Sequence, residues 1–381
     1  MIIKNGLVLK GENNCFEPTD ICISEGKIAS FGNAADALKT SEDFDAEGLY
    51  VIPGFIDTHN HGCVGVEFAA EDEDFEKARI WLAEQGITGV APTVRALPVE
   101  SCVAAEKNIL REAGKASGGA KVLGIHLEGP FVSHSRCGAM CPPDIVCEPE
   151  ALRRMAEAAC GMLKIMTLSP ERENAIEVIK AAGELGVKIS LGHTDATYET
   201  AKAAIEAGAS RATHIFNAMR PLSHRETGIL GAALTDDRVT CEMICDFVHL
   251  DEAAMRMVYR LKGAEKITII SDSGYMTGLG DGEYKVGDHE QVRIVKNGVC
   301  RTLEGRIAGS CVSMLAGAKN LLRMGIPLEE VSLMGSLNPA RALGAEASVG
   351  SLAEGKAADI VVCDGELNIK AVFVDGKRVC A

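Results

Sequence analysis

Two histidines flank a single asparagine in the segment "PGFIDTHNHG", residues 53–62. Alternate side chains of a β-strand point to the same face, so His59 and His61 would lie together on one face. Neutral imidazole nitrogens bind zinc and other first-row metals, and two neighbouring rings suit such an ion. A pair of surface histidines near a turn would explain this segment equally well, so the rest of the chain must decide.

Further residues of the metal-ligand type recur along the chain, each at the end of a short apolar segment. They are His126 and Glu128, His193 and Asp195, His214, Asp246 and His249, and Asp272. Scattered surface histidines would not be expected to recur in this way. Histidines and carboxylates without thiolates predict an open hydrolytic site for a divalent ion such as zinc or iron.

Such an ion would polarise a carbonyl and lower the pKa of a bound water toward about 7. A carboxylate beside that water can take its proton and later pass it to a leaving amine. Asp272 is the natural candidate, because it ends the last of the apolar segments. Asp195 is expected to cap the following helix or to orient His193, and His126 to have a structural role.

Eight apolar segments rich in β-forming residues alternate with helical patterns between "YVIPGFIDTH" and "KITIISDSG". This alternation predicts an α/β fold, a (β/α)8 barrel, with a doubly wound open sheet as the alternative. Active sites of such barrels lie at the carboxyl ends of the strands, where the residues above fall. The link after "THIF" is the least clearly helical, and "VRIVKNGVCRTLEG" predicts an inserted hairpin.

Both ends of the chain show short strands separated by turn signals. We therefore expect residues 1–52 and 348–381 to build one small β-sandwich domain around a catalytic barrel of residues 53–347.

The 381 residues carry a formal net charge of -15, which argues against a nucleic-acid or membrane-surface partner. An anionic substrate would need locally placed cations. The first residues lack the apolar run of a signal peptide, and no stretch approaches a membrane span. We expect the 14 cysteines to be reduced thiols of a cytoplasmic protein.

Five segments occur in an order and spacing that resemble one known family. They are "PGFIDTHNHG", "HLEGPF", "GHTDAT", "THIFNAM" and "ISDSG". Together with the flanks "NPARALG" and "GSLAEGKAADIVV", they are similar to the N-acetylglucosamine-6-phosphate deacetylase family of the amidohydrolase superfamily. The resemblance covers nearly the whole chain. It implies metal-dependent hydrolysis of the acetamide of N-acetylglucosamine 6-phosphate, with the galactosamine epimer or another N-acyl substrate as alternatives. Loss of enzymatic function, seen in some barrel relatives, is disfavoured because all the expected ligands are present.

The resemblance also implies a ligand set. Glu128, His193 and His214 match the metal ligands that the family shares. His59 and His61 match the extra pair of members with a second metal, which implies one or two ions per subunit.

Asp272 matches the family's catalytic acid and base. The substrate-binding positions are matched by Asn217, Ala218, Arg225 and His249. In the family the arginine reaches the sugar phosphate across the interface of a homodimer, and its guanidinium suits a phosphate.

One position departs from the family pattern. The segment after "HLEGPF" places Met140 where the family has a histidine that touches the amide side of the substrate. A thioether cannot donate a hydrogen bond. Either His134 of the same segment replaces this contact, or the N-acyl group is bound differently.

Overall fold

The computed structural model describes residues 1–11, 15–32, 43–140, 142–286 and 291–379. Eight parallel strands form its centre, each hydrogen-bonded to its neighbours, and a bridge between Asn60 and Ser273 brings the ends together. In barrel order they are β6 (Phe55–Asn60), β9 (Ile87–Val94), β11 (Ile125–Glu128), β12 (Leu163–Leu168), β13 (Lys188–Leu191), β14 (Arg211–Ala212), β15 (Thr240–Ile244) and β16 (Ile267–Ile270). The short β10 (Lys121–Val122) also pairs with β9. The predicted (β/α)8 barrel is confirmed, and an open doubly wound sheet is excluded.

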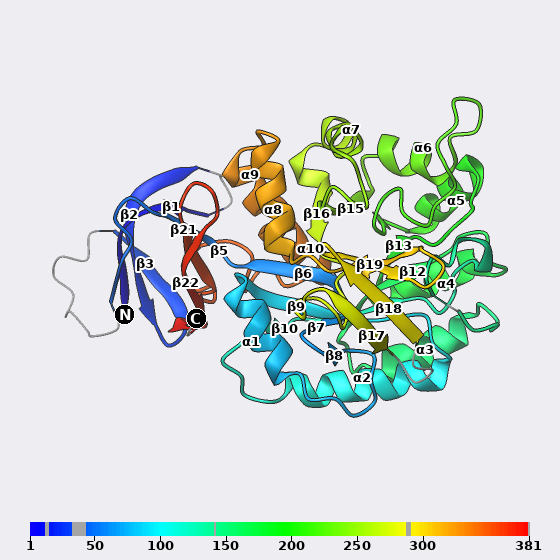
Figure 1. Cartoon of the computed structure of the whole chain (residues 1–381), viewed down its shortest axis with the longest axis horizontal. Helices are drawn as coiled ribbons and strands as arrows, with labels where there is room; N and C mark the ends of the chain where they lie inside the picture. Colours follow the sequence, from blue (N-terminus) through cyan, green and yellow to red (C-terminus); the bar gives the residue numbers. More distant parts are fainter. Residues whose placement is uncertain (12–14, 33–42, 141, 287–290, 380–381) are drawn as a thin grey trace.

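Helices surround this barrel (Figure 1). They are α1 (Glu76–Glu84), α2 (Val99–Ala113), α3 (Pro149–Ala158), α4 (Ala175–Glu184), α5 (Tyr198–Ala207), α6 (Gly228–Thr235), α7 (Glu252–Lys262) and α8 (Met314–Arg323). Each packs an apolar face inward; in α7, for example, Met255 and Val258 are buried. The link after β14 is an irregular segment that leads into α6, in keeping with its weak helical pattern. Among the described residues, none of the helices combines the length and apolar character needed to cross a bilayer.

The amino ends of the barrel strands are covered by the last helical segment. It comprises α9 (Leu328–Ser332), the π-helical turn η3 (Leu333–Leu337) and α10 (Asn338–Leu343). Ala340 and Leu343 of α10 pack with Ile56 and Ile165 of the barrel in one buried cluster. This end of the barrel is therefore plugged, and the opposite end carries the mouth.

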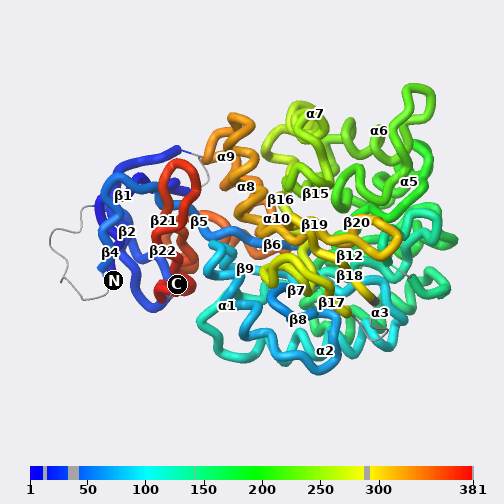
Figure 2. The backbone as a smooth tube through the Cα atoms, in the orientation of Figure 1, coloured from blue at the N-terminus to red at the C-terminus, as the bar shows by residue number. Residues whose placement is uncertain are grey.

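The two ends of the chain meet in one sheet beside the barrel, where the blue and red segments lie together (Figure 2). Its strands are β1 (Ile2–Leu9), β2 (Phe16–Ser24), β3 (Lys27–Phe31), β4 (Phe44–Asp45), β5 (Tyr50–Pro53), β21 (Ile360–Cys363), β22 (Ile369–Val374) and β23 (Lys377–Arg378). The central β5 pairs with β1 on one side and with β21 on the other. The boundaries between this domain and the barrel, expected at residues 52/53 and 347/348, stay a prediction.

The predicted hairpin is part of a larger insertion. The antiparallel strands β17 (Gly282–Val286), β18 (Gln291–Lys296), β19 (Val299–Thr302) and β20 (Ile307–Ser310) form a four-stranded sheet after β16. Ser310 forms a bridge with Ser273, which holds the insertion against the end of the last barrel strand. The two outer strands, β17 and β20, were not predicted.

Candidate metal centre and active site

Three side chains from three different strand ends converge at the barrel mouth. Glu128 is the last residue of β11, and its Oε1 lies 2.9 Å from His193 Nε2 and 3.0 Å from His214 Nε2. The two Nε2 atoms are themselves 3.0 Å apart. All three side chains are buried. The spacing therefore matches a ligand set gathered around one point.

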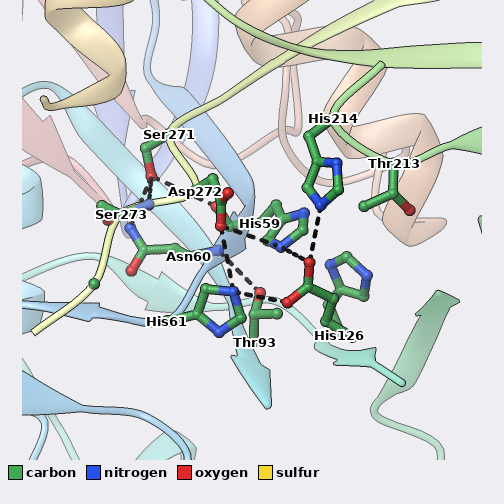
Figure 3. Close-up of polar contacts among 12 residues, drawn as sticks. His59, Asn60, His61, Thr93, His126, Thr213, His214, Ser271, Asp272 and Ser273 are labelled. Carbon is green, nitrogen blue, oxygen red and sulfur yellow. Dashed lines mark hydrogen bonds and ion pairs between the residues drawn. The ribbon is translucent and has the colours of Figure 1, made fainter. Parts of the chain in front are cut away.

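The second histidine pair lies on the other side of the same carboxylate. His61 Nε2 is 3.2 Å from Glu128 Oε2, and His59 Nε2 is 3.3 Å from Glu128 Oε1. Asp272 Oδ1 closes this group, 3.3 Å from His61 Nε2 and 3.5 Å from His59 Nε2. Figure 3 shows His59, His61, His214 and Asp272 turned toward one another. Glu128 thus stands between two clusters of nitrogen atoms.

The hydrogen bonds behind these rings indicate which nitrogens face the cluster as acceptors. His193 Nδ1 lies 2.9 Å from the carbonyl oxygen of Arg136, and His59 Nδ1 lies 3.0 Å from Glu242 Oε2. In the neutral form of each ring the proton therefore lies on Nδ1, and Nε2 then directs a lone pair at Glu128. His59 Nε2 is also buried without a hydrogen-bond partner. Lone pairs and a carboxylate at this distance repel one another, so the donor set fits a divalent cation.

Electrostatics at the mouth favour positive charge. Burial alone would raise the pKa of Glu128, but the charges of His193 and His59 outweigh it and lower the pKa. Burial alone would lower the pKa of His61, whereas hydrogen bonds to Asp272 and Glu128 raise it to about 9. The carboxylates therefore stay ionised and favour a positive charge beside them, carried by protonated rings or by a divalent ion that takes the place of those protons.

The backbone is unusual at the residues that leave the strands. His193, His214 and Asp272 have φ values of 48°, 28° and 49°, in the left-handed region that side chains other than glycine rarely adopt. Each follows a barrel strand by two residues, where the ladder has ended. Such strained positions cluster at functional sites, where surrounding structure holds them in place.

A cavity of about 620 Å³ opens over the cluster. The residues with predicted substrate roles that line it are Asn217, Ala218, His249 and Met140. His249 is held by Asp246, with Nδ1 2.8 Å from Oδ2. Two predicted residues are not brought there. Arg225 lies on an exposed loop, and His134 is half exposed, 4.0 Å from Asp144.

The chain matches the model of the amidohydrolase family over residues 50–379. It belongs to the amidohydrolase family. This amidohydrolase is 33% identical to N-acetylglucosamine-6-phosphate deacetylase of Lysinibacillus sphaericus, covering 99% of this chain and 97% of the relative. It is 36% identical to N-acetylgalactosamine-6-phosphate deacetylase of Escherichia coli O157:H7, covering 96% of each. A point mutant of the Mycobacterium smegmatis N-acetylglucosamine-6-phosphate deacetylase, solved with N-acetyl-D-glucosamine-6-phosphate, superposes with a TM-score of 0.90 at 33% identity, covering 100% and 99% of the two chains.

Sequence reasoning missed a buried ion pair behind the amidohydrolase site. Glu242 of β15 accepts hydrogen bonds from Arg211 Nη2 at 3.1 Å and from the backbone amide of His214 at 3.3 Å, besides its contact with His59. Glu242 is fully buried and Arg211 is 3% exposed. A charged residue inside the apolar segment "VTCEMIC" was the available signal. Because Glu242 contacts two candidate ligand residues, it fixes their positions.

Other polar residues around the mouth serve the structure. Both ring nitrogens of His126 are engaged, by the Thr58 carbonyl at 3.0 Å and Thr167 Oγ1 at 2.9 Å. Burial and the charge of His59 lower the pKa of His126 to about 3, so it stays neutral, in agreement with the predicted structural role.

Asp195 does not cap the next helix, as one of its two expected roles required; its carboxylate pairs with Arg136 at 2.7 Å and Arg220 at 3.0 Å. Thr197 caps the next helix, accepting from the amide of Thr200. Arg136 supplies the carbonyl that holds His193, so Asp195 acts on the site only through that segment.

Proposed function

We propose that this amidohydrolase hydrolyses the acetamide of N-acetylglucosamine 6-phosphate, releasing acetate and glucosamine 6-phosphate. The observation that carries the proposal is the convergence of Glu128, His193, His214 and Asp272 in one cavity that also contains His249. The relatives with this name match nearly the full length of the chain.

In this proposal Glu128, His193 and His214 hold a divalent ion, zinc or iron, and His59 and His61 provide for a second. The ion, when bound, polarises the acetamide carbonyl and activates a water. The ligand atoms of Glu128, His193 and His214 lie within 4.8 Å of one another, and so do those of His59, His61 and Glu128.

Asp272 is the proton carrier of the proposed reaction. Burial would raise its pKa, but the charge of His59 and the hydrogen bond to His61 lower it, so the carboxylate is ionised at neutral pH. It can accept a proton from the attacking water and then donate it to the departing amine.

In this proposal a second copy of the chain completes the site for the sugar phosphate. His249 lies inside the cavity, whereas Arg225 is exposed on a loop whose ends are bridged between Ser223 and Glu226. We therefore propose a homodimer in which Arg225 of each subunit reaches the other subunit's phosphate site. Leu222 and Phe247 are close in sequence to Arg225 and His249. Their large apolar side chains are 45% and 40% exposed, which supports their burial against a partner subunit.

Met140 lines the cavity together with the apolar side chains of Leu97, Pro98 and Met276. We propose that the N-acyl group packs against this apolar wall. The exposed position of His134 gives no support to its replacing the family histidine. The twelve described cysteines are free thiols, which fits the proposed cytoplasmic location.

Acetate release from a panel of N-acetyl sugars tests the function. The panel contains the glucosamine and galactosamine epimers, each with and without the 6-phosphate, at matched metal content. The proposal requires the highest kcat/KM for N-acetylglucosamine 6-phosphate. The galactosamine epimer is the second candidate, because the relative named for it is as similar as those named for the glucosamine compound. A panel with no acetate release from either phosphate would refute both.

A further inference from the structure

A second cavity, of about 360 Å³, lies at the opposite end of the barrel from the mouth. Four strands begin at its wall, at Lys188, Arg211, Thr240 and the residue before Ile267, and α10 lines another side of it. The lining residues are Lys188, Ser210, Arg211, Arg238, Thr240, Glu265, Lys266, Asn338, Arg341 and Ala342. None of them lines the cavity at the mouth. This basal cavity is therefore separate from the site of the proposed function.

Its charge is opposite to that of the whole protein. Five lining residues are basic and one, Glu265, is acidic, in a chain with a formal net charge of -15. Three of the cations have a carboxylate partner: Arg341 pairs with Glu265 at 3.2 Å, Arg238 with Asp236 at 2.6 Å, and Arg211 with Glu242 at 3.1 Å.

The two lysines lack such a partner. Lys188 donates to the carbonyl oxygen of Arg341, and in the described part of the chain no carboxylate forms an ion pair with Lys188 or Lys266. Burial and the charge of Arg211 lower the pKa of Lys188. Like charges gathered in this way destabilise the fold unless an anion neutralises them.

Arg211 adds an unsatisfied donor. Its side chain is 3% exposed, and its Nη2 is used by Glu242, but its buried Nε has no hydrogen-bond partner. A buried guanidinium nitrogen without a partner costs free energy, which a bound acceptor would recover. An oxyanion with several acceptor oxygens meets the need of both the arginine and the lysines.

We propose that the basal cavity binds a phosphate group, with Lys188, Lys266 and Arg211 as its principal donors. A dianionic phosphate matches the charge of the two lysines and offers enough oxygens for the guanidinium as well. The group could belong to inorganic phosphate or to a phosphate ester. In the ester, hydroxyl groups would meet Ser210, Thr240 and the side-chain oxygen of Asn338, which is buried without a partner.

Titration calorimetry on the metal-loaded full chain, at constant ionic strength, tests the proposal with inorganic phosphate and with glucose 6-phosphate as probes. Lys266→Met removes one basal cation, and Lys202→Met is the matched control, because Lys202 is exposed on α5 outside the cavity. We expect Lys266→Met to weaken binding of at least one probe by about tenfold or more, the loss of a charge-assisted hydrogen bond. Lys266→Arg should restore it. The preferred probe identifies the source of the phosphate.

His249→Ala alters the mouth and tests whether the probe binds there instead. This variant should still bind the probe whose binding Lys266→Met weakens. Circular dichroism checks that each variant is folded. Identical isotherms for wild type, Lys266→Met and Lys202→Met with both probes would overturn the basal site, and would leave the proposed deacetylase activity untouched.

Discussion

Replacing Glu242 by glutamine should damage both the stability of the barrel and its affinity for metal. The carboxylate is fully buried and holds Arg211 at 3.1 Å and His59 at 3.0 Å. Neutralising it leaves the Arg211 charge buried without its partner, which costs about 3–5 kcal/mol of the free energy of unfolding. The glutamine also binds the His59 ring more weakly, and loss of such a contact behind a ligand lowers metal affinity by about 10- to 100-fold.

A second variant separates the two effects. In Arg211→Met combined with Glu242→Leu, an apolar pair of similar volume replaces the ions, which is often neutral or stabilising. We expect this double variant to regain the unfolding free energy lost in Glu242→Gln, measured in urea. It should not regain metal affinity, because His59 still lacks an acceptor for its Nδ1 proton. Glu199→Gln, on the surface of α5, is the control for the chemical change alone.

Two results would contradict this reasoning. If Glu242→Gln binds metal as tightly as the wild type, the carboxylate does not position His59. If the double variant recovers metal affinity together with stability, the histidine was disturbed only through general loosening of the barrel.

Four further predictions concern the mouth. Chelation should abolish acetate release and a divalent ion should restore it, while His193→Ala should lose most bound metal by elemental analysis; full activity of metal-free protein would refute the metal centre. Asp272→Asn should keep its metal but lose on the order of a hundredfold or more in kcat, and a normal rate would place the proton carrier elsewhere. Arg225→Ala should raise KM for the phosphorylated sugar by about 10- to 100-fold and barely affect the sugar without phosphate, whereas equal effects would indicate a structural role. Met140→His should improve turnover of N-acetylglucosamine 6-phosphate if a donor is missing on the acyl side, and His134→Ala should be silent because His134 lies outside the cavity; a severe His134→Ala effect would show that the loop moves to bring this histidine in.

The sequence predicted the rim of the barrel better than its interior. Ligand residues such as Glu128 and His193 lie at the carboxyl ends of strands or just beyond them. Parallel strands of a barrel bring these ends to one rim, so order along the chain was enough. The pair of Arg211 and Glu242 depends on which side chains of two neighbouring strands face inward. β14 is only two residues long, too short to show an alternating pattern.

The basal cavity was beyond sequence reasoning for a different reason. It combines residues from Lys188 to Ala342, which meet only after the barrel closes and α10 covers it. Similarly, "VRIVKNGVCRTLEG" predicted a hairpin but gave no sign that Arg293 would line the mouth.

The position of β5 has a consequence for how the protein is made on the ribosome. Val51 and Ile52 are fully buried and pair with Val362 and Val361 of β21, which is synthesised only after the whole barrel. Until then one edge of β5 has no partner, and unpaired apolar edges promote association with other chains. The terminal sheet is thus the last part of the protein that can be completed. A chain that stops before β21 would carry a complete barrel and a terminal sheet with an unpaired apolar edge at β5, and such an edge favours aggregation.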